Sequence, residues 1–437
     1  MKYVSTRDPS LRVDFQEALF QGLAGDGGLF IPEEDLKLQQ HFRAFDKNTP
    51  FQEIATLVSA YLLKGEVDAG GVQRIVKNAF PFEPRLVKTG DGLSILELFH
   101  GPSSAFKDFG ASFLAAAMEE FLQNSDRRAV ILTATSGDTG SAVAQAFHNK
   151  KNVDVVILYP SGRVSPLQEK QLTTLGGNVL ALEVEGSFDD CQRLVKSAFL
   201  DSDLRKVLPL TSANSISLGR LIPQSFYYIW AFAQLKESLE EELFFCVPSG
   251  NFGNLTAGVW AWKWGLPVTG FIAATNANDV VPRYLETGNY QPKPSVATYS
   301  NAMDVGSPSN FERLEVVFQK NWNLMRTMIF GEVVSDAETL ETIRRVYQDH
   351  KMFLCPHTAV GYKAAELFRQ HNRLDHAQIC VLGTAHPAKF LDVVELAAGQ
   401  GPELPPNLAL AASKEKHSVV MKPALEELSR VLLERFA

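Results

Sequence analysis

The sequence has few cysteines, and their spacing matches no familiar cysteine-based site. The 437-residue chain has four cysteines and no C-x-x-C pair. The cysteines are Cys191, Cys246, Cys355 and Cys380. This spacing argues against a zinc ligand set and against the disulfide framework of a small secreted protein. We therefore expect reduced thiols, no metal centre and a reducing, intracellular setting.

Long apolar runs and a surplus of basic residues are also absent. No stretch reaches the roughly 18 apolar residues of a membrane span, and residues 1–23 lack the continuous apolar segment of a signal peptide. The 42 Lys and Arg residues against 50 Asp and Glu give a net charge of −8, which is poorly suited to neutralising a phosphate backbone. These absences favour a soluble, cytoplasmic protein with no membrane or nucleic-acid partner. A local basic pocket for one small anion is compatible with them.

What the sequence does contain is typical of a large globular protein. Hydrophobic residues make up 45% of it and charged residues 21%. A chain of this length is expected to form two or three packed units. Residues 1 to about 90 have mainly helical patterns, with a short opening strand and an amphipathic helix over 15–21, and we interpret this part as one helix-rich domain.

From residue 94 onward, short apolar runs alternate with turns and longer helical patterns. The runs lie at 94–99, 129–134, 153–159, 244–248 and 379–383. This alternation is typical of parallel α/β sheets, and loops at the carboxyl ends of such strands can meet at one crevice. The proline-containing region 275–345 is predicted to be an insertion with helices, and 399–411 a turn-rich bridge to a short C-terminal helix.

The loop at 100–110, HGPSSAFKDFG, contains a lysine in an unusual setting. Lys107 is predicted to begin a helix whose apolar face includes Phe109 and Phe113. Burial and the positive end of the helix dipole would both favour the neutral amine, a nucleophile that can form a Schiff base. A surface lysine with its stem against the helix start is the commoner arrangement. The loop alone leaves both interpretations open.

The loop at 249–254, SGNFGN, joins a predicted strand to a predicted helix. Gly250 and Gly253 permit close backbone approach, and the free N–H groups at a helix N-terminus can bind a phosphate. The loop matches neither of the standard phosphate-binding glycine motifs. A plain connecting turn is the alternative interpretation.

Further polar residues follow other predicted strands. The loop at 133–141 offers hydroxyls and backbone donors that suit a substrate carboxylate, or it forms only a capping turn. Arg163 can bind an anion bidentately, or it is simply solvated. The pair Asn214 and Ser215 is polar but is equally typical of a turn.

Several long motifs occur in a fixed order over nearly the whole chain. They include VDFQEALFQGLAGDGGLFIPE, ELFHGPSSAFKDFG, LTATSGDTGSAVAQAF, ILYPSGRVSPLQEKQ, SANSISLGRLIPQ, VPSGNFGNLTAG, SNAMDVGSPSNFER and LGTAHPAKF. Together these motifs resemble the threonine synthase family, within the fold type II pyridoxal-phosphate enzymes. The resemblance implies an α/β fold with two parallel-sheet subdomains around a cofactor crevice and a helix-rich N-terminal domain. The implied boundaries are 1–90 for the N-terminal domain and 91–437 for the catalytic region, with the smaller subdomain at about 129–240.

The resemblance also implies roles for individual residues. Lys107 would form the Schiff base with pyridoxal 5'-phosphate, and Thr384 would face the pyridine nitrogen of the cofactor. A cradle for the cofactor phosphate would consist of Gly250, Asn251, Phe252, Gly253 and Asn254. A site for the substrate carboxylate would consist of Thr135, Ser136, Gly137, Asp138 and Thr139. The candidates for the phosphate of the substrate are Arg163, Ser165, Asn214 and Ser215.

The implied activity is the conversion of O-phospho-L-homoserine and water to L-threonine and phosphate. One alternative is a related phospho-lyase that releases 2-oxobutyrate, and another is a non-catalytic relative that keeps the fold. The chain is expected to be a monomer or a homodimer.

Three details near Lys107 are left open by the sequence. Many bacterial members of the family are expected to have threonine and an apolar residue where this chain has Ser103 and Ser104, which puts the fine positioning of Lys107 in question. His100 and His386 lie near the proposed site and are either proton shuttles or hydrogen-bonded structural groups. Asp108 is expected to point away from the lysine and to favour the helix start.

Overall fold

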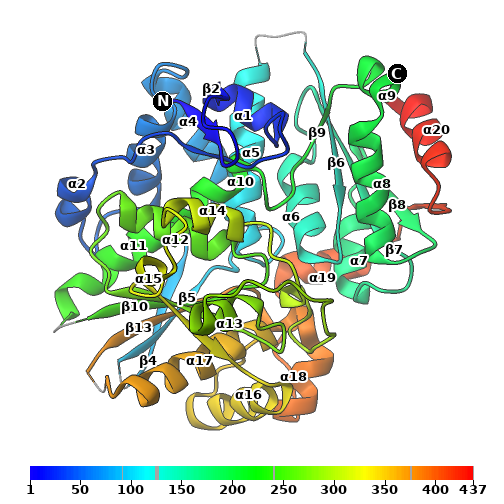
Figure 1. The fold of residues 1–437 in the computed structure, drawn as a ribbon. Coiled ribbons are helices and arrows are strands. Elements are labelled where there is room, and N and C mark those ends of the chain that lie inside the picture. Colours follow the sequence, from blue (N-terminus) through cyan, green and yellow to red (C-terminus); the bar gives the residue numbers. More distant parts are fainter. Residues whose placement is uncertain (91, 124–126, 240–241, 375, 437) are drawn as a thin grey trace.

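The computed structural model describes residues 1–90, 92–123, 127–239, 242–374 and 376–436, which form three sheets with helices packed around them (Figure 1). In the view of Figure 1 the six-stranded sheet lies at lower left, the five-stranded sheet at right and the N-terminal region at upper left. No helix within these residues is both long and apolar enough to cross a membrane.

The six-stranded sheet is parallel except at one edge. Its strand order is β12 (Ile329–Val333), β11 (Gly270–Thr275), β10 (Leu243–Pro248), β13 (Gln378–Gly383), β5 (Leu93–Glu97) and β4 (Arg85–Gly90). Only β4 runs antiparallel to its neighbour. Every residue of β10 and β11 is buried, as expected for central parallel strands with helices on both faces.

The five-stranded sheet is entirely parallel and takes one strand from the end of the chain. Its order is β14 (Val419–Met421), β8 (Val179–Val184), β7 (Val153–Pro160), β6 (Ala129–Ala134) and β9 (Leu210–Thr211). The strand β14 has no counterpart among the sequence-based predictions, because three residues are too few to show a period. The predicted C-terminal helix is α20 (Leu425–Phe436), which packs on α8 (Phe188–Leu200).

The N-terminal region is rich in helices, as predicted, and it also contains a small antiparallel sheet where the sequence indicated a single short opening strand. The sheet consists of β2 (Arg12–Val13), β1 (Tyr3–Ser5) and β3 (Phe30–Pro32), and the helices are α1 (Phe15–Gln21), α2 (Gln39–Ala44), α3 (Phe51–Leu62) and α4 (Ala69–Ala79). The bounds of α1 match the prediction because its ends are marked in the sequence: Asp14 caps the first turn and Gly22 follows the last residue with a φ of 72°.

The predicted apolar runs are all strands, but they divide between the two large sheets. The runs at 94–99, 244–248 and 379–383 became β5, β10 and β13, and the other two became β6 and β7. Region 275–345 contains the predicted helices α13 (Val280–Thr287), α14 (Phe311–Val317) and α15 (Trp322–Met325), together with the edge strand β12.

The remaining helices cover the two large sheets. They are α5 (Lys107–Leu122), α6 (Asp138–Phe147), α7 (Pro166–Thr173), α9 (Ser202–Val207), α10 (Leu218–Leu221), α11 (Ser225–Leu235), α12 (Gly253–Lys263), α16 (Asp336–His350), α17 (Pro356–Asn372), α18 (Leu391–Ala398) and α19 (Pro406–Ser413). The helix α5 is the central one, since it packs on α4, α6 and α10.

Gly110 lets α5 approach α10 closely, because a Cβ at this position would lie 2.3 Å from the carbonyl oxygen of Arg220. Gly110→Ala is expected to lower the free energy of unfolding by about 2 kcal/mol, since overpacking costs about 1–3 kcal/mol. Urea unfolding followed by circular dichroism measures the change. The control is Gly25→Ala, whose Cβ would meet no atom within 4 Å. Equal effects of the two substitutions would contradict the close-packing argument.

Candidate active site

Lys107 is held in place by contacts between two chain segments that are far apart in sequence. The loop between β5 and α5 runs beside the segment that follows β13: Ala105 forms an isolated bridge with Ala385, and the N–H of Phe106 donates to the carbonyl of Thr384 at 2.8 Å. Because α5 begins at Lys107, these contacts fix the lysine next to Thr384 in the fold.

The environment of Lys107 favours the neutral amine. Its side chain is 16% exposed, and its Nζ lies 3.9 Å from Oδ2 of Asp138. Burial lowers the pKa of Lys107 to about 8, opposed by the Asp138 carboxylate and assisted by the positive charges of Arg220 and Lys389. About one tenth of the amine is therefore neutral at pH 7, far more than for an ordinary lysine, and the neutral form is the one that attacks a carbonyl.

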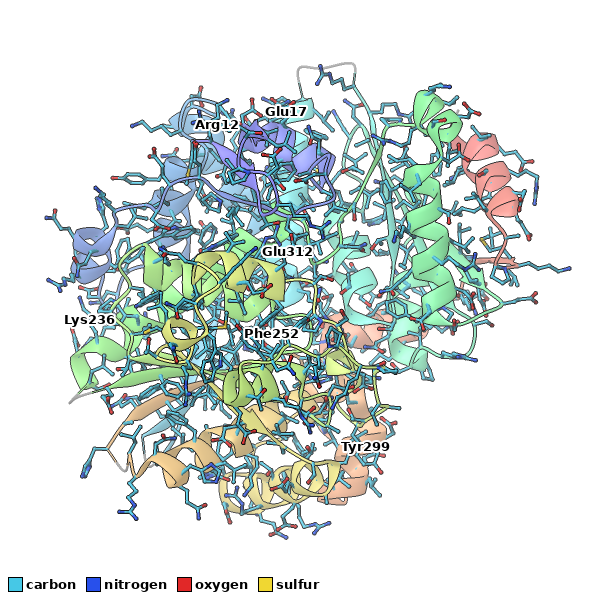
Figure 2. All side chains as sticks on the ribbon, in the orientation of Figure 1. Arg12, Glu17, Lys236, Phe252, Tyr299 and Glu312 are labelled. Atoms are coloured by element: carbon cyan, nitrogen blue, oxygen red, sulfur yellow. The ribbon has the colours of Figure 1, made fainter. Side chains whose placement is uncertain are left out.

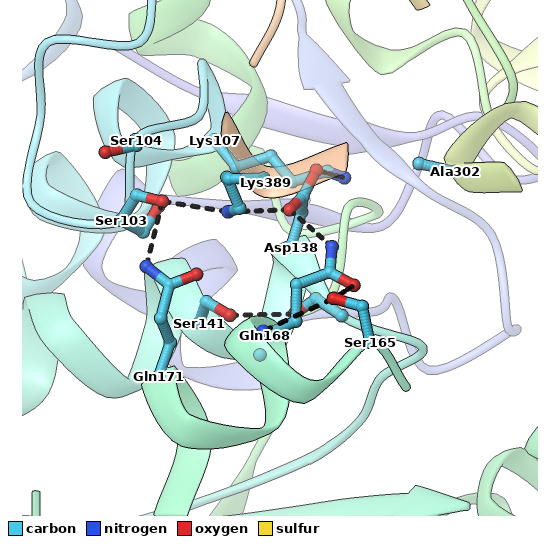
Figure 3. Close-up of polar contacts among 12 residues, drawn as sticks. Ser103, Ser104, Lys107, Asp138, Ser141, Ser165, Gln168, Gln171, Ala302 and Lys389 are labelled. Atoms are coloured by element: carbon cyan, nitrogen blue, oxygen red, sulfur yellow. Dashed lines mark hydrogen bonds and ion pairs between the residues drawn. The ribbon is translucent and has the colours of Figure 1, made fainter. Parts of the chain in front are cut away.

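Asp138 is the centre of a buried polar network that spans both large sheets (Figure 3). Its Oδ1 pairs with Lys389 Nζ at 2.7 Å and accepts a hydrogen bond from Gln168 Nε2 at 2.9 Å. Burial on its own would raise the pKa of Asp138, but the nearby ammonium groups of Lys389 and Lys107 outweigh it and hold the pKa well below its usual range. The carboxylate is therefore charged at every pH at which the protein is expected to work.

The loop that precedes Asp138 is held in shape by the hydroxyl group of one of its residues, Thr135. Thr135 Oγ1 accepts hydrogen bonds from the N–H groups of Gly137 at 3.0 Å and Gly140 at 2.9 Å. Gly137 has a φ of 148°, and a Cβ there would lie 2.7 Å from the amide of Gln168, so glycine is required. Of the other residues of the predicted carboxylate site, Ser136 is exposed and Thr139 is half-buried.

The SGNFGN loop connects β10 to α12 and keeps a tight, defined shape. Phe252, labelled near the centre of Figure 2, has a φ of 58°, which is rare for a residue other than glycine. Ser249 Oγ donates to Oδ1 of Asn254 at 2.8 Å, and Asn254 Nδ2 donates to the carbonyl of Pro248 at 2.9 Å. A Cβ at Gly250 would lie 2.7 Å from Cα of Met303, so this glycine is needed for close packing.

Two of the candidates for the substrate phosphate lie beside other predicted site residues. Asn251 Nδ2 donates to Ser215 Oγ at 2.6 Å, and Thr133 Oγ1 donates to Asn214 Oδ1 at 2.5 Å. The contact with Asn251 brings Ser215 to the SGNFGN loop.

The other two candidates come from one loop but have different surroundings. Ser165 caps α7 and donates to Oε1 of Gln168 at 3.0 Å, which connects it to the Asp138 network. Arg163, in contrast, is exposed. The described contacts join Ser165, but not the Arg163 side chain, to that network.

Thr384 is buried, and its Oγ1 has no hydrogen-bond partner within the described parts of the chain. An unpaired buried hydroxyl is costly, and a ring nitrogen of a bound group would satisfy it. At the start of α12 the N–H of Leu255 donates to Oδ1 of Asn254 at 3.0 Å, whereas the N–H groups of Gly253 and Asn254 precede any backbone acceptor within the helix. The residues present therefore fit a group that carries an aldehyde for Lys107, a phosphate for the SGNFGN loop and a ring nitrogen for Thr384.

The two serines that depart from the expected family pattern have different surroundings. Ser103 Oγ is buried without a hydrogen-bond partner in the described residues, while Ser104 adopts a φ of 57°. Asn407, in α19, donates to Ser104 Oγ at 2.8 Å and to the carbonyl of Pro102 at 2.9 Å. The C-terminal part of the chain thus fixes the loop that leads to Lys107.

Asp108 also stabilises this loop, which the sequence analysis did not foresee. It is buried, and its Oδ2 accepts a hydrogen bond from the N–H of Ser103 at 2.9 Å. Burial raises the pKa of Asp108 to about 6, against the lowering effect of Ser103.

The histidines singled out by the sequence have hydrogen-bonding partners of their own. His386 Nδ1 accepts from the N–H of Ala388 at 3.2 Å, and His100 Nε2 pairs with Glu97 at 2.9 Å. His357, which was not singled out, is buried and accepts from the N–H of Ala302 at 3.1 Å through Nε2.

Lys389 is the main site residue that sequence reasoning missed. Its side chain is fully buried, and besides Asp138 it contacts the carbonyl of Ser103 at 2.8 Å. The motif LGTAHPAKF contains Lys389 together with Thr384 and His386, but nothing in the sequence brings position 389 next to position 138. The same reason explains why the sequence did not indicate Gln168, or Gln171, whose Nε2 donates to the carbonyl of Ser103 at 3.1 Å.

Comparison with known protein families covers almost all of the chain. The family model for pyridoxal-phosphate dependent enzymes matches residues 85–384, and the models for the N terminus and the C-terminal part of threonine synthase match 2–80 and 358–432. The chain belongs to the threonine synthase family. It is therefore a pyridoxal-phosphate-dependent enzyme with the fold type II architecture.

Individual members of the threonine synthase family are similar over their full length. Threonine synthase of Haemophilus influenzae is 44% identical over 411 residues, which cover 93% of this chain and 94% of that protein. The crystal structure of threonine synthase from Escherichia coli has a TM-score of 0.91 at 40% identity and covers 99% of this chain. A structure of threonine synthase from Brucella melitensis with bound pyridoxal phosphate has a TM-score of 0.92 at 36% identity, and 99% of each chain is covered.

The buried His357 predicts a dependence of stability on pH. Burial lowers its pKa to about 4, whereas the unfolded chain takes up this proton near the ordinary value of 6.5. The unfolded state then binds more protons between these two pH values, so stability rises with pH across this window and is lost as the pH falls. The slope of the logarithm of the unfolding constant against pH gives the number of protons exchanged on unfolding, and in His357→Asn this number should be smaller by up to about one.

Urea unfolding at several pH values between about 4.5 and 7 measures this slope. His386, whose pKa is also lowered to about 4 by burial, contributes equally in both proteins and cancels in the comparison. The control is His350→Asn, at the exposed end of α16. An unchanged slope in His357→Asn would show that the folded protein tolerates the charged imidazole.

Proposed function

We propose that this chain is a threonine synthase that converts O-phospho-L-homoserine and water to L-threonine and phosphate. The observation that carries the proposal is the buried, partly neutral amine of Lys107, held 3.9 Å from Asp138 in a chain of this family. The full-length similarity to threonine synthases at 43–44% identity supports the choice of substrate.

The residues for the cofactor are proposed as follows. Lys107 Nζ binds the aldehyde, the SGNFGN loop at 250–254 binds the phosphate with its backbone N–H groups, and Thr384 Oγ1 pairs with the ring nitrogen. When bound, pyridoxal phosphate withdraws electrons from the substrate carbon atoms next to it. The neutral hydroxyl of Thr384 moderates this withdrawal, since it does not force the ring nitrogen to be protonated as a carboxylate would.

The residues for the substrate are proposed from the loops around Asp138. The N–H groups and hydroxyls of 135–139, at the N-terminus of α6, bind the substrate carboxylate. Arg163, Ser165, Asn214 and Ser215 bind the phosphate of the substrate. The negative charge of Asp138 would repel both anions, but Lys389 neutralises it at 2.7 Å.

Proton transfer is assigned to Lys107. With cofactor and substrate bound, the free amine of Lys107 would accept a proton at Nζ from the α carbon of the substrate and would return protons elsewhere on the substrate as phosphate leaves and water adds. A pKa of about 8 suits both directions near neutral pH, because neither the protonated nor the neutral form is rare.

The reaction is tested by incubating the purified chain with O-phospho-L-homoserine and measuring all products together. Threonine is expected to account for nearly all of the phosphate released, with 2-oxobutyrate as the small remainder. Lys107→Ala is expected to lower the rate by at least about 100-fold. It should also remove the visible absorption of the bound cofactor at about 410–430 nm.

Two outcomes of this assay would reject the proposal. Formation of 2-oxobutyrate in the same amount as phosphate would identify a phospho-lyase instead. A well-folded wild-type chain with no visible cofactor absorption would favour a non-catalytic relative.

Thr384→Val removes the unpartnered hydroxyl while it keeps the shape of the side chain. The dissociation constant for pyridoxal phosphate is expected to rise by roughly tenfold, the equivalent of one hydrogen bond of about 1.4 kcal/mol. The thermal stability of the cofactor-free chain should not fall, because no protein partner is lost within the described residues. Fluorescence titration and thermal unfolding measure the two quantities. Thr384→Ser is the control and should bind the cofactor almost as the wild type does.

A further inference from the structure

Lys389 connects three parts of the chain at one buried point. It lies in the segment that follows β13, where its Nζ contacts Asp138 Oδ1 at 2.7 Å and the carbonyl oxygen of Ser103 at 2.8 Å. Figure 3 shows Lys389 between these two partners, with Lys107 on the other side of the carboxylate. The side chain of Lys389 is completely buried, so water does not reach its charge.

The two oxygens of Asp138 are used unequally. Oδ1 accepts from both Lys389 and Gln168, while Oδ2 lies 3.9 Å from Lys107 Nζ. At these distances the carboxylate interacts more strongly with Lys389 than with Lys107, because the Coulomb energy falls with separation. Lys389 is therefore the principal counter-ion of Asp138.

We propose that Lys389 is a positioning residue that neutralises Asp138, so that Lys107 is left without a full counter-ion and can lose its proton to form the covalent bond with the cofactor. The inference rests on the role of Lys107 in the proposed function. It adds a residue that acts through Asp138 and does not need to contact the substrate.

The charged and titratable groups that face Lys107 come from several helices, and His357 among them is uncharged near neutral pH. They are Asp138 from α6, Arg220 from α10, His357 from α17 and Lys389 itself. The first favours the ammonium form of Lys107, while the cations of Arg220 and Lys389 oppose it. Removing Lys389 takes away one opposing charge and also leaves the Asp138 carboxylate with Lys107 as its nearest cation. Both changes favour the protonated, unreactive amine.

The test measures the protonation of Lys107 directly in the full-length chain after the cofactor has been removed. Lysines are labelled with acetic anhydride at a series of pH values, and the modified peptides are quantified by mass spectrometry. Only a neutral amine reacts, so the pH of half-maximal labelling reports the pKa of Lys107. Lys206, on the exposed surface, provides an internal reference in every sample.

In Lys389→Met, the labelling midpoint of Lys107 is expected to rise by at least about one pH unit, which means roughly tenfold slower labelling below the midpoint. Lys389→Arg, which keeps the charge, should stay close to the wild type. Asp138→Asn should lower the midpoint, because it removes the group that favours the ammonium form. The double variant Asp138→Asn with Lys389→Met should return to within about half a unit of the wild type, which a merely structural role of Lys389 would not produce.

An unchanged or lowered midpoint in a folded Lys389→Met would overturn the proposal. If that variant does not fold because it buries an unpaired carboxylate, the decision rests on Asp138→Asn and the double variant, in which that charge is gone. An unchanged midpoint in Asp138→Asn would then overturn it. Failure of the proposed function is a separate result, since it shows in the reaction products and not in the labelling midpoints.

Discussion

The arrangement of the site depends on the ion pairs and hydrogen bonds of the Asp138 carboxylate. It follows the end of β6 in the five-stranded sheet, while Lys107 and Lys389 follow β5 and β13 in the six-stranded sheet. Burying three charges would be costly without close pairing and further hydrogen bonds. Gln168 satisfies the carboxylate and the Ser103 carbonyl satisfies Lys389, so the network joins the two sheets at the point where chemistry is expected.

The same network also sets the reactivity of Lys107, because the fold decides how the Asp138 carboxylate is shared between two lysines. A lysine that is simply buried would lose its charge, and a lysine paired with a carboxylate would keep it. Here the carboxylate is shared with a second lysine at shorter distance, so desolvation dominates and the pKa of Lys107 falls to about 8. A small difference in distance, 2.7 Å against 3.9 Å, thus decides which of the two lysines is the counter-ion.

The N-terminal region contributes to the site from a distance. Arg313, fully buried in α14, donates to the carbonyls of Phe30 at 2.9 Å and Ile216 at 2.7 Å. It therefore links β3 to the segment that contains Asn214 and Ser215. Glu312, beside it and labelled in Figure 2, pairs with Arg7 of the N-terminal segment at 3.0 Å. The N-terminal region is thus part of the support of the loops that carry the proposed substrate residues.

The sequence by itself determined the local elements and the family. The apolar runs specified the strands β5, β6, β7, β10 and β13, although other strands of the two large sheets, such as β8 and β11, were not predicted. Asp14 and Gly22 specified the ends of α1, and the long ordered motifs identified the relatives, because these signals lie within short stretches of chain. It also indicated that Lys107 begins a helix, which α5 confirms.

Only the tertiary structure decided which of these elements meet. Strand β14 pairs with β8 across more than half of the chain, and Lys389 reaches Asp138 from a different sheet. Contacts of this kind depend on how the sheets pack and not on any local pattern, so spacing along the chain does not reveal them. Burial is decided in the same way, which is why the sequence could suggest that Lys107 is neutral but could not name the charges that make it so.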